Sequence, residues 1–155
     1  MTACSFTGHR VIAANELEKI KDLLARAINF AYDNGVRTFN CGGALGFDTL
    51  AALAVLKKKE AHSDVRLVLY IPCADQCARW NKKDVDVYNN ILAGCDEQIL
   101  VSEVYNADCM RRRNEYLAQN CDMLVAYVNK ERSGAAQTVR MARALGKKVY
   151  NLFRG

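Results

Sequence analysis

Short apolar runs alternate with helical patterns along the chain, and this alternation constrains the fold more than any other feature. The strand-like runs cover residues 3–6, 36–41, 65–71, 97–101, 123–128 and 147–152. The helical patterns between them cover residues 16–34, 47–59, 82–93, 108–119 and 135–145. Strands joined by helices of this length form parallel βαβ units, whose helices cover both faces of the sheet. The sequence therefore predicts one domain over residues 1–155, a three-layer Rossmann-like α/β fold with a mainly parallel sheet.

The first helical pattern shows how well the ends are marked. Its apolar residues recur three and four positions apart and share one face. Asn15 is the residue type that caps a helix start, and Asn34-Gly35 is typical of a helix end. We therefore expect an amphipathic helix that begins after Asn15 and stops at Gly35.

Composition limits the classes of function. The formal charge of +5 suits a small anionic ligand and permits weak nucleic-acid contact. It is smaller than the net positive charge typical of a dedicated nucleic-acid-binding domain. No apolar run reaches the roughly 20 residues of a membrane span, and the N-terminal residues do not form a signal-peptide pattern. The seven cysteines are an odd number and are evenly spread, so we expect no disulfide framework and no metal site. These features predict a cytoplasmic protein without membrane contact.

In a parallel α/β sheet, ligands bind outside the carboxyl ends of the strands, so the loops there are the candidate site. Thr7, Gly8, His9 and Arg10 follow the first run. Thr7 offers a hydroxyl, Gly8 a close backbone approach, and Arg10 a cation that suits phosphate. His9 is a hydrogen-bonding group or an acid–base group. The alternative is that Gly8 only turns the chain and Arg10 lies on the surface.

A glycine-rich turn follows the second run and leads into a helix. Its glycines are Gly42, Gly43 and Gly46, a spacing that matches neither the dinucleotide fingerprint nor a P-loop. The N–H groups of such a turn favour phosphate, whereas packing of helix on strand is the alternative. Asp48, in the first helical turn, suits a ribose hydroxyl better than a phosphate.

An irregular stretch follows the third run and holds Arg79 and Trp80, the only tryptophan. Trp80 either stacks on a base, with Arg79 paired to phosphate, or it covers the edge of the core.

Arg113 and Asn114 open a later helix, where a cation is unfavourable unless an anion offsets it. Arg113 shares a helical face with Tyr116 and Leu117 and should lean toward the sheet, so we take Arg113 and Asn114 as ligand-binding candidates. We expect Arg111 and Arg112 to be solvated or paired to another subunit.

A second turn of this kind follows the fifth run. Ser133, the Gly134 amide and Thr138 form a possible anion cradle at the start of a helix. The alternative is a serine N-cap followed by a glycine turn, with no ligand. Two such turns on one sheet favour a nucleotide or a related phosphorylated ligand.

In their order, these motifs resemble a known family. T-G-H-R, G-G-A-L-G-F-D, Pro72 with Trp80, the R-N pair and S-G-x-x-x-T resemble the YpsA-like branch of the SLOG superfamily. That superfamily also holds the DprA/Smf DNA-processing proteins and the LOG-type nucleotide phosphoribohydrolases. The resemblance implies a Rossmann-like domain that forms homo-oligomers and binds a nucleotide-derived ligand such as NAD, ADP-ribose or a nucleoside monophosphate.

The chain departs from the LOG-type hydrolases at one motif. Met110 to Asn114 reads M-R-R-R-N and retains the arginine as Arg113. Where the hydrolases place a catalytic glutamate, this chain has Val139, Arg140 and Met141. Glycosidic cleavage needs a carboxylate, so hydrolysis is disfavoured unless Asp48 or Glu131 substitutes.

Three hypotheses follow for the function. The leading one is a cytoplasmic sensor or regulatory domain for a nucleotide-derived ligand. The second is an enzyme that cleaves an N-glycosidic or phosphoester bond, with no catalytic residue assigned. The third is a binder of single-stranded nucleic acid like DprA, which the absence of a strong basic face and of an extra domain disfavours.

Overall fold

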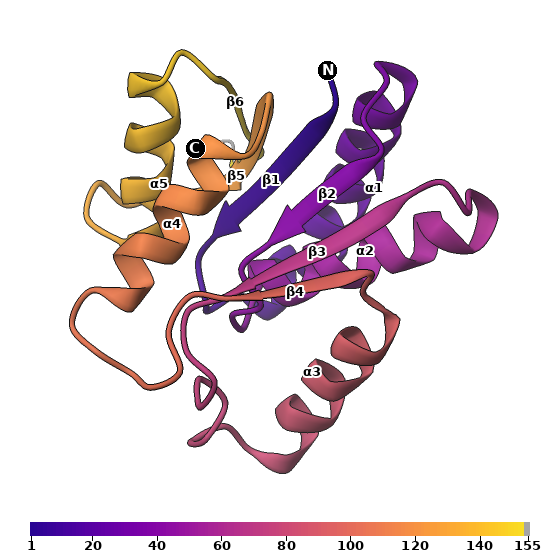
Figure 1. The fold of residues 1–155 in the computed structure, drawn as a ribbon. Coiled ribbons are helices and arrows are strands. Elements are labelled where there is room, and N and C mark those ends of the chain that lie inside the picture. The colour runs from indigo at the N-terminus through magenta and orange to yellow at the C-terminus, as the bar shows by residue number, and fades with distance from the viewer. Residues whose placement is uncertain (154–155) are drawn as a thin grey trace.

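The computed structural model describes residues 1–153, which form six strands, five α-helices and one 3-10 turn at Ala14–Glu16 (Figure 1). The strands are β1 (Ala3–Gly8), β2 (Thr38–Cys41), β3 (Arg66–Ile71), β4 (Glu97–Leu100), β5 (Met123–Tyr127) and β6 (Lys148–Asn151). The helices are α1 (Leu17–Asp33), α2 (Phe47–Ala61), α3 (Lys82–Gly94), α4 (Cys109–Gln119) and α5 (Gly134–Ala144). Every predicted element is present, in the predicted order.

All neighbouring strands pair in parallel, in the order β4-β3-β2-β1-β5-β6. The chain moves outward from β1 to β4 on one side and then returns to add β5 and β6 on the other. The direction of winding therefore reverses between β1 and β5. In open α/β sheets this reversal leaves a crevice at the carboxyl ends of the two strands, where ligands bind.

Helices cover both faces of the sheet, which confirms the three-layer architecture (Figure 1). Strand β5 shows the two faces directly, because successive side chains on a strand point to opposite sides. Met123 and Val125 belong to the larger apolar cluster, shared with α1, α2 and α3. Leu124 and Ala126 belong to a second cluster, shared with α4 and α5. Burial on both faces explains why the segment reads as a continuous apolar run.

The predicted cap of the first helix is wrong in one detail. Asn15 lies inside the 3-10 turn, and the residue before α1 is Glu16, whose side chain makes no capping hydrogen bond. The 3-10 turn supplies backbone hydrogen bonds at this end, as Glu16 N donates to Ala13 O at 2.9 Å. The other end is as predicted, since Gly35 has φ +97°, a conformation that favours glycine.

The seven cysteines are free thiols, as predicted, and five of them are buried. Cys4 and Cys41 pack inside the larger apolar cluster, and Cys121 packs beneath α5. In residues 1–153, no helix combines the length and the apolar character that crossing a membrane requires.

Candidate functional site

Loops from three strands and one helix meet at a cavity of about 260 Å³, at the carboxyl ends of β1 and β5. Nine of the residues predicted from the sequence line it: Thr7, Gly8, His9, Arg10, Asp48, Arg113, Asn114, Ser133 and Gly134. The loops after β1 and β5 and the starts of α2, α4 and α5 therefore converge at the crevice that the strand order defines.

A chain of hydrogen bonds holds these elements together. Arg113 Nη1 donates to Gly42 O at 2.6 Å, and Arg113 Nε donates to Asn114 Oδ1 at 3.0 Å. Asn114 Nδ2 in turn donates to Gly134 O and to Gln137 Oε1, both at 3.3 Å. The two side chains thus link the loop after β2, helix α4 and the start of α5. The guanidinium uses two of its five donors in these contacts.

Asp48 brings a carboxyl group into the cavity at high electrostatic cost. It is 6% exposed, and Oδ2 accepts a hydrogen bond from Ala44 N at 3.3 Å. Within residues 1–153, Oδ1 is the one buried side-chain nitrogen or oxygen atom without a hydrogen-bond partner. Burial raises the pKa of Asp48 to about 6, against the opposing effects of Arg113 and Arg10. A buried polar atom of this kind calls for a partner that the protein does not supply.

The start of α5 supplies N–H donors to the same cavity. Ser133 is the N-cap, and its Oγ accepts from Ala136 N at 3.0 Å, as the serine-cap interpretation predicts. Among the described residues, neither Gly134 N nor Ala135 N donates a hydrogen bond, and both residues line the cavity. The cap and the cavity are therefore compatible, and the positive end of α5 faces the site.

In the glycine turn after β2, Ala44 lines the cavity, whereas the three glycines lie behind its wall. A Cβ at Gly42 would lie 2.9 Å from both Arg113 Cζ and Asp48 Oδ2, so only glycine lets these groups approach the backbone. Gly46 has φ +75° and packs against the backbone of His9 and Arg10. Phe47 N donates to His9 O at 3.0 Å, which occupies a donor at the start of α2. Direct phosphate contact by Gly42, Gly43 and Gly46 stays a prediction; the structure gives them a positioning role.

His9 joins two loops of the site. Its Nε2 accepts a hydrogen bond from Asn129 N at 2.9 Å, so the ring is neutral there and carries its proton on Nδ1. Burial and the nearby Lys130 lower the pKa of His9 below its ordinary value. Because Nε2 already accepts this hydrogen bond, His9 is better suited to holding the loops after β1 and β5 together than to acting as a general base.

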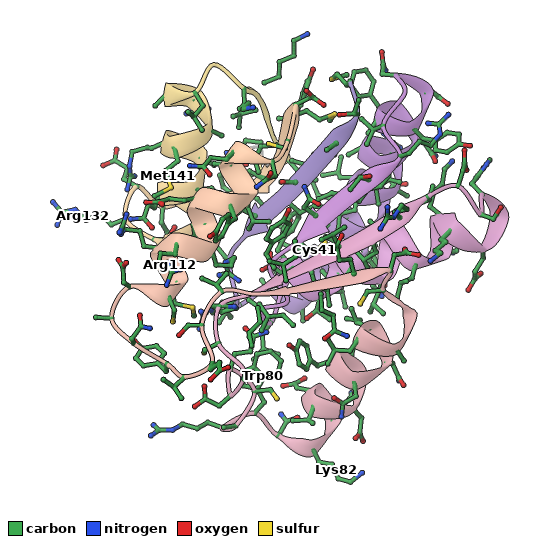
Figure 2. All side chains as sticks on the ribbon, viewed as in Figure 1. Cys41, Trp80, Lys82, Arg112, Arg132 and Met141 are labelled. Atoms are coloured by element: carbon green, nitrogen blue, oxygen red, sulfur yellow. The ribbon has the colours of Figure 1, made fainter. Side chains whose placement is uncertain are left out.

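A second cavity, of about 440 Å³, adjoins the first. Both are lined by Arg10, Ala44 and Met110, and the second also holds Arg79 and Trp80. Trp80 lies in the loop between β3 and α3, in the lower half of the view in Figure 2. Its ring is half-buried and stands edge-on to Tyr88, with ring centres 5.3 Å apart. The structure thus places the predicted Arg79 and Trp80 beside the main cavity and not in it.

The structure also shows where the predicted residues Thr138 and Arg111 lie. Thr138 is fully buried, and its hydroxyl donates to Gly134 O at 3.1 Å, so it stabilises the first turn of α5 and does not line either cavity. Arg111 is exposed, as predicted, and its ion pairs are with Asp108 and Glu115 on its own helix.

Sequence reasoning missed several cavity residues. Met110 and Leu117 lie three residues from Arg113 and Asn114 along α4, on the same helical face, so helical spacing could have found them. Asp75, Gln76 and Tyr105 line the second cavity from irregular segments, where no periodicity indicates direction.

Among the described residues that line the main cavity, Asp48 is the one with a carboxyl group that could take part in a reaction. Asp48 lines the main cavity, whereas Glu131 lines a separate hollow beside β6. Over residues 1–153, no group of three or more metal-ligating side chains is present. The arrangement offers cations, backbone donors and one buried acceptor, which together suit a ligand that carries both phosphate and hydroxyl groups.

Fold and site together define a Rossmann-like α/β domain with an anion-compatible cavity at its topological switch point. The family model YpsA, described as the YspA SLOG family, matches residues 10–152. The chain therefore belongs to the YspA SLOG family, as the sequence motifs predicted.

Curated relatives give the same assignment. A UPF0398 protein of Halalkalibacterium halodurans is 28% identical over 118 residues, covering 75% of this chain and 62% of that protein. The SPbeta prophage-derived protein YoqJ of Bacillus subtilis is 27% identical over 150 residues, covering 86% and 87%. The chain thus spans less than two thirds of the UPF0398 relative and most of YoqJ.

Solved structures share the fold. DNA processing protein A (DprA) of Streptococcus pneumoniae has a TM-score of 0.69 at 19% identity, over 96% of this chain and 49% of that one. DprA of Helicobacter pylori, described for its single-stranded DNA binding mode, has a TM-score of 0.65 at 19% identity, over 96% and 63%. At this identity the likeness establishes the Rossmann-like architecture.

Proposed function

We propose that this protein binds a nucleotide-derived ligand of the NAD, ADP-ribose or nucleoside phosphate class and acts as a sensor or regulatory domain. The observation that carries the proposal is Asp48 Oδ1, a buried acceptor that has no partner within residues 1–153, in a cavity otherwise rich in donors. A ribose hydroxyl would donate to it, while Arg113, Arg10 and the start of α5 would hold phosphate oxygens.

The arrangement also suits a sensor. The hydrogen bonds through Arg113 and Asn114 join three elements, so a ligand that contacts them would change how firmly the loops are held together. A ligand with different affinities for loosely and firmly held loops shifts their populations. Such a shift is the signal that a partner or a second copy of the chain would detect.

Differential scanning fluorimetry with NAD, ADP-ribose, AMP and cyclic nucleotides tests the proposal. A ligand present at 100 times its Kd should raise Tm by roughly 5–10 °C in a domain of this size. No shift with any of these ligands at millimolar concentration would contradict it.

A matched pair of arginine variants locates the binding. Arg10 is exposed and lines both cavities, whereas Arg111 is exposed and pairs within α4. Arg10→Ala should weaken ligand binding about tenfold or more, because it removes a charge-assisted contact. Arg111→Ala should leave the affinity unchanged.

Single-stranded nucleic-acid binding is a second candidate, favoured by one observation. A hollow of about 570 Å³ beside α5 and β6 is lined by Lys130, Arg132, Arg140 and Arg143, with Glu131 as its one acidic residue. Figure 2 shows Arg132 extending outward from this side of the molecule. Binding there should weaken steeply with salt, and Arg140→Ala with Arg143→Ala should reduce it without changing nucleotide affinity. An affinity independent of salt would reject this candidate.

Hydrolysis remains an alternative use of the main cavity, with Asp48 as its carboxylate. Release of base or phosphate from NAD or a nucleoside monophosphate would support it. Loss of that release in Asp48→Asn, with ligand still bound, would assign the carboxylate a role in the reaction.

A further inference from the structure

The second cavity shares part of its wall with the first, and unlike the first it is lined by the aromatic side chains of Trp80 and Tyr105. Arg10, Ala44 and Met110 line both, and the rest of the second cavity is formed by the loop after β3 together with Tyr105. A ligand whose ribose contacts Asp48 would extend its base past these shared residues. The aromatic side chains of Trp80 and Tyr105 then stand where a base would lie.

Gln76 is the residue in this cavity whose hydrogen bonds are most informative. Its Nε2 donates to Gly43 O at 3.3 Å and to the Tyr88 hydroxyl at 3.0 Å. A backbone carbonyl only accepts hydrogen bonds, so the amide nitrogen, and not the amide oxygen, must face Gly43. The orientation of the amide group is therefore set by the glycine turn.

The fixed amide leaves one hydrogen-bonding atom available. Within residues 1–153, no hydrogen bond is made to Gln76 Oε1, and Gln76 lines the cavity. Asp75, its neighbour in the chain and in the cavity wall, is also an acceptor when ionised. The wall formed by these two residues therefore presents acceptors to whatever enters.

We propose that the second cavity is a base subsite and that Gln76 Oε1 selects a base with an exocyclic amino group, as in adenine or cytosine. This inference rests on the proposed function. The amino group of adenine would donate to Oε1, whereas hypoxanthine presents a carbonyl oxygen at the same position. Two acceptors facing each other without a proton leave both unsatisfied, and sites of this kind reject the mismatched base strongly.

Paired titrations with AMP and IMP test the selection, with the fluorescence of Trp80, the chain's single tryptophan, as a local signal. We expect AMP to bind at least tenfold more tightly than IMP and to change the emission of Trp80. Equal affinities would overturn the base-selection proposal while leaving the proposed function intact. Binding of neither AMP, IMP nor ADP-ribose would overturn both.

Variants assign the selection to Gln76. Gln76→Met removes the acceptor while keeping the length of the side chain, so the AMP-to-IMP affinity ratio should fall toward one. Tyr88→Phe removes one of the two anchors of the amide and should lower the ratio while the ligand still binds. Gln119→Met, an exposed glutamine at the end of α4, is the control and should leave the ratio unchanged.

Measured unfolding temperatures show whether a variant has lost binding only because it no longer folds. Gln76→Met and Tyr88→Phe should retain a cooperative melt, and their AMP-to-IMP ratio is compared only under conditions where both variants are folded. A ratio that stays at the wild-type value in folded Gln76→Met would overturn the role of Gln76.

Discussion

Asp48 is the side chain on which the account of this site depends. Its carboxyl group is buried, one oxygen has no partner among the described residues, and Arg113 and Arg10 only partly offset the cost of its charge. A pKa raised from 3.8 to about 6 means that the folded protein holds the proton more tightly than the unfolded chain does. The contribution of Asp48 to stability is therefore greatest below pH 4 and is lost as the pH rises through 6.

Comparison of the wild type with Asp48→Asn isolates this contribution. The free energy of unfolding of the wild type, minus that of the variant, should fall by about 2 kcal/mol between pH 4 and pH 7. The full shift in pKa corresponds to roughly 3 kcal/mol at 1.36 kcal/mol per unit, and part of it lies below pH 4. Urea denaturation at several pH values measures it. A difference that does not vary with pH would show that Asp48 has an ordinary pKa.

Ligand binding should show the opposite dependence on pH. If a ribose hydroxyl donates to the ionised carboxylate, affinity falls as the pH drops below about 6, approaching tenfold per pH unit. ADP-ribose suits the measurement by calorimetry because its phosphates are diesters that do not titrate in this range. In Asp48→Asn the affinity should be lower and should lack this component; an unchanged pH profile would remove Asp48 from the site.

Gly42 is a second residue on which the site depends, because there is no room for a Cβ at this position. A Cβ there would collide with the guanidinium of Arg113 and the carboxyl of Asp48. Gly42→Ala should therefore destabilise the fold by about 1–3 kcal/mol, the usual cost of overpacking, and should weaken ligand binding. Gly134→Ala is the matched control for stability, because its Cβ would meet nothing closer than Asn114 Nδ2 at 3.7 Å. Equal melting temperatures for the two variants would contradict this packing.

Among the secondary-structure elements, α4 is the one that assembles the site. It follows β4 at one edge of the sheet and leads to β5 on the far side of β1, so the chain crosses the sheet through it. Its inner face carries Met110, Arg113, Asn114 and Leu117 toward the cavity. The helical-face argument from sequence therefore predicts the arginine run correctly, since Arg113 lies inward and Arg111 lies on the surface.

The loops after β1 and β5 are coupled through His9. His9→Ala removes the acceptor for Asn129 N, so amide hydrogen exchange at Asn129 should accelerate about tenfold, equivalent to one ordinary hydrogen bond. Because the pKa of His9 is lowered, the hydrogen bond is present at neutral pH and is lost as the pH falls below the ordinary value of 6.5. His62→Ala, at the distant end of α2, should leave Asn129 unaffected; equal protection in both variants would contradict the brace.

In the whole molecule, the sequence predicted the architecture well and the cavity only in part. Strongly periodic segments such as residues 17–33 and fully apolar ones such as residues 123–127 were assigned correctly, because their burial pattern is visible in the residue types. Phosphate contact by Gly42, Gly43 and Gly46 stays a prediction; the structure packs Gly42 against Arg113 and Gly46 against the backbone of His9 and Arg10, close approaches that the sequence does not show. Gln76 was missed for the same reason, since its role depends on contacts with Gly43 and Tyr88 that only the folded loop creates.

In the proposed function, the loops from β1 and β5 and the starts of α2, α4 and α5 form one nucleotide-binding cavity. Titration of isotope-labelled protein with ADP-ribose, followed by amide NMR, tests it most directly. We expect saturable shifts at Gly8, Gly134 and Ala135, with one ligand bound per chain. Absence of shifts at millimolar ADP-ribose, or shifts confined to a distant surface such as residues 57–62, would contradict it.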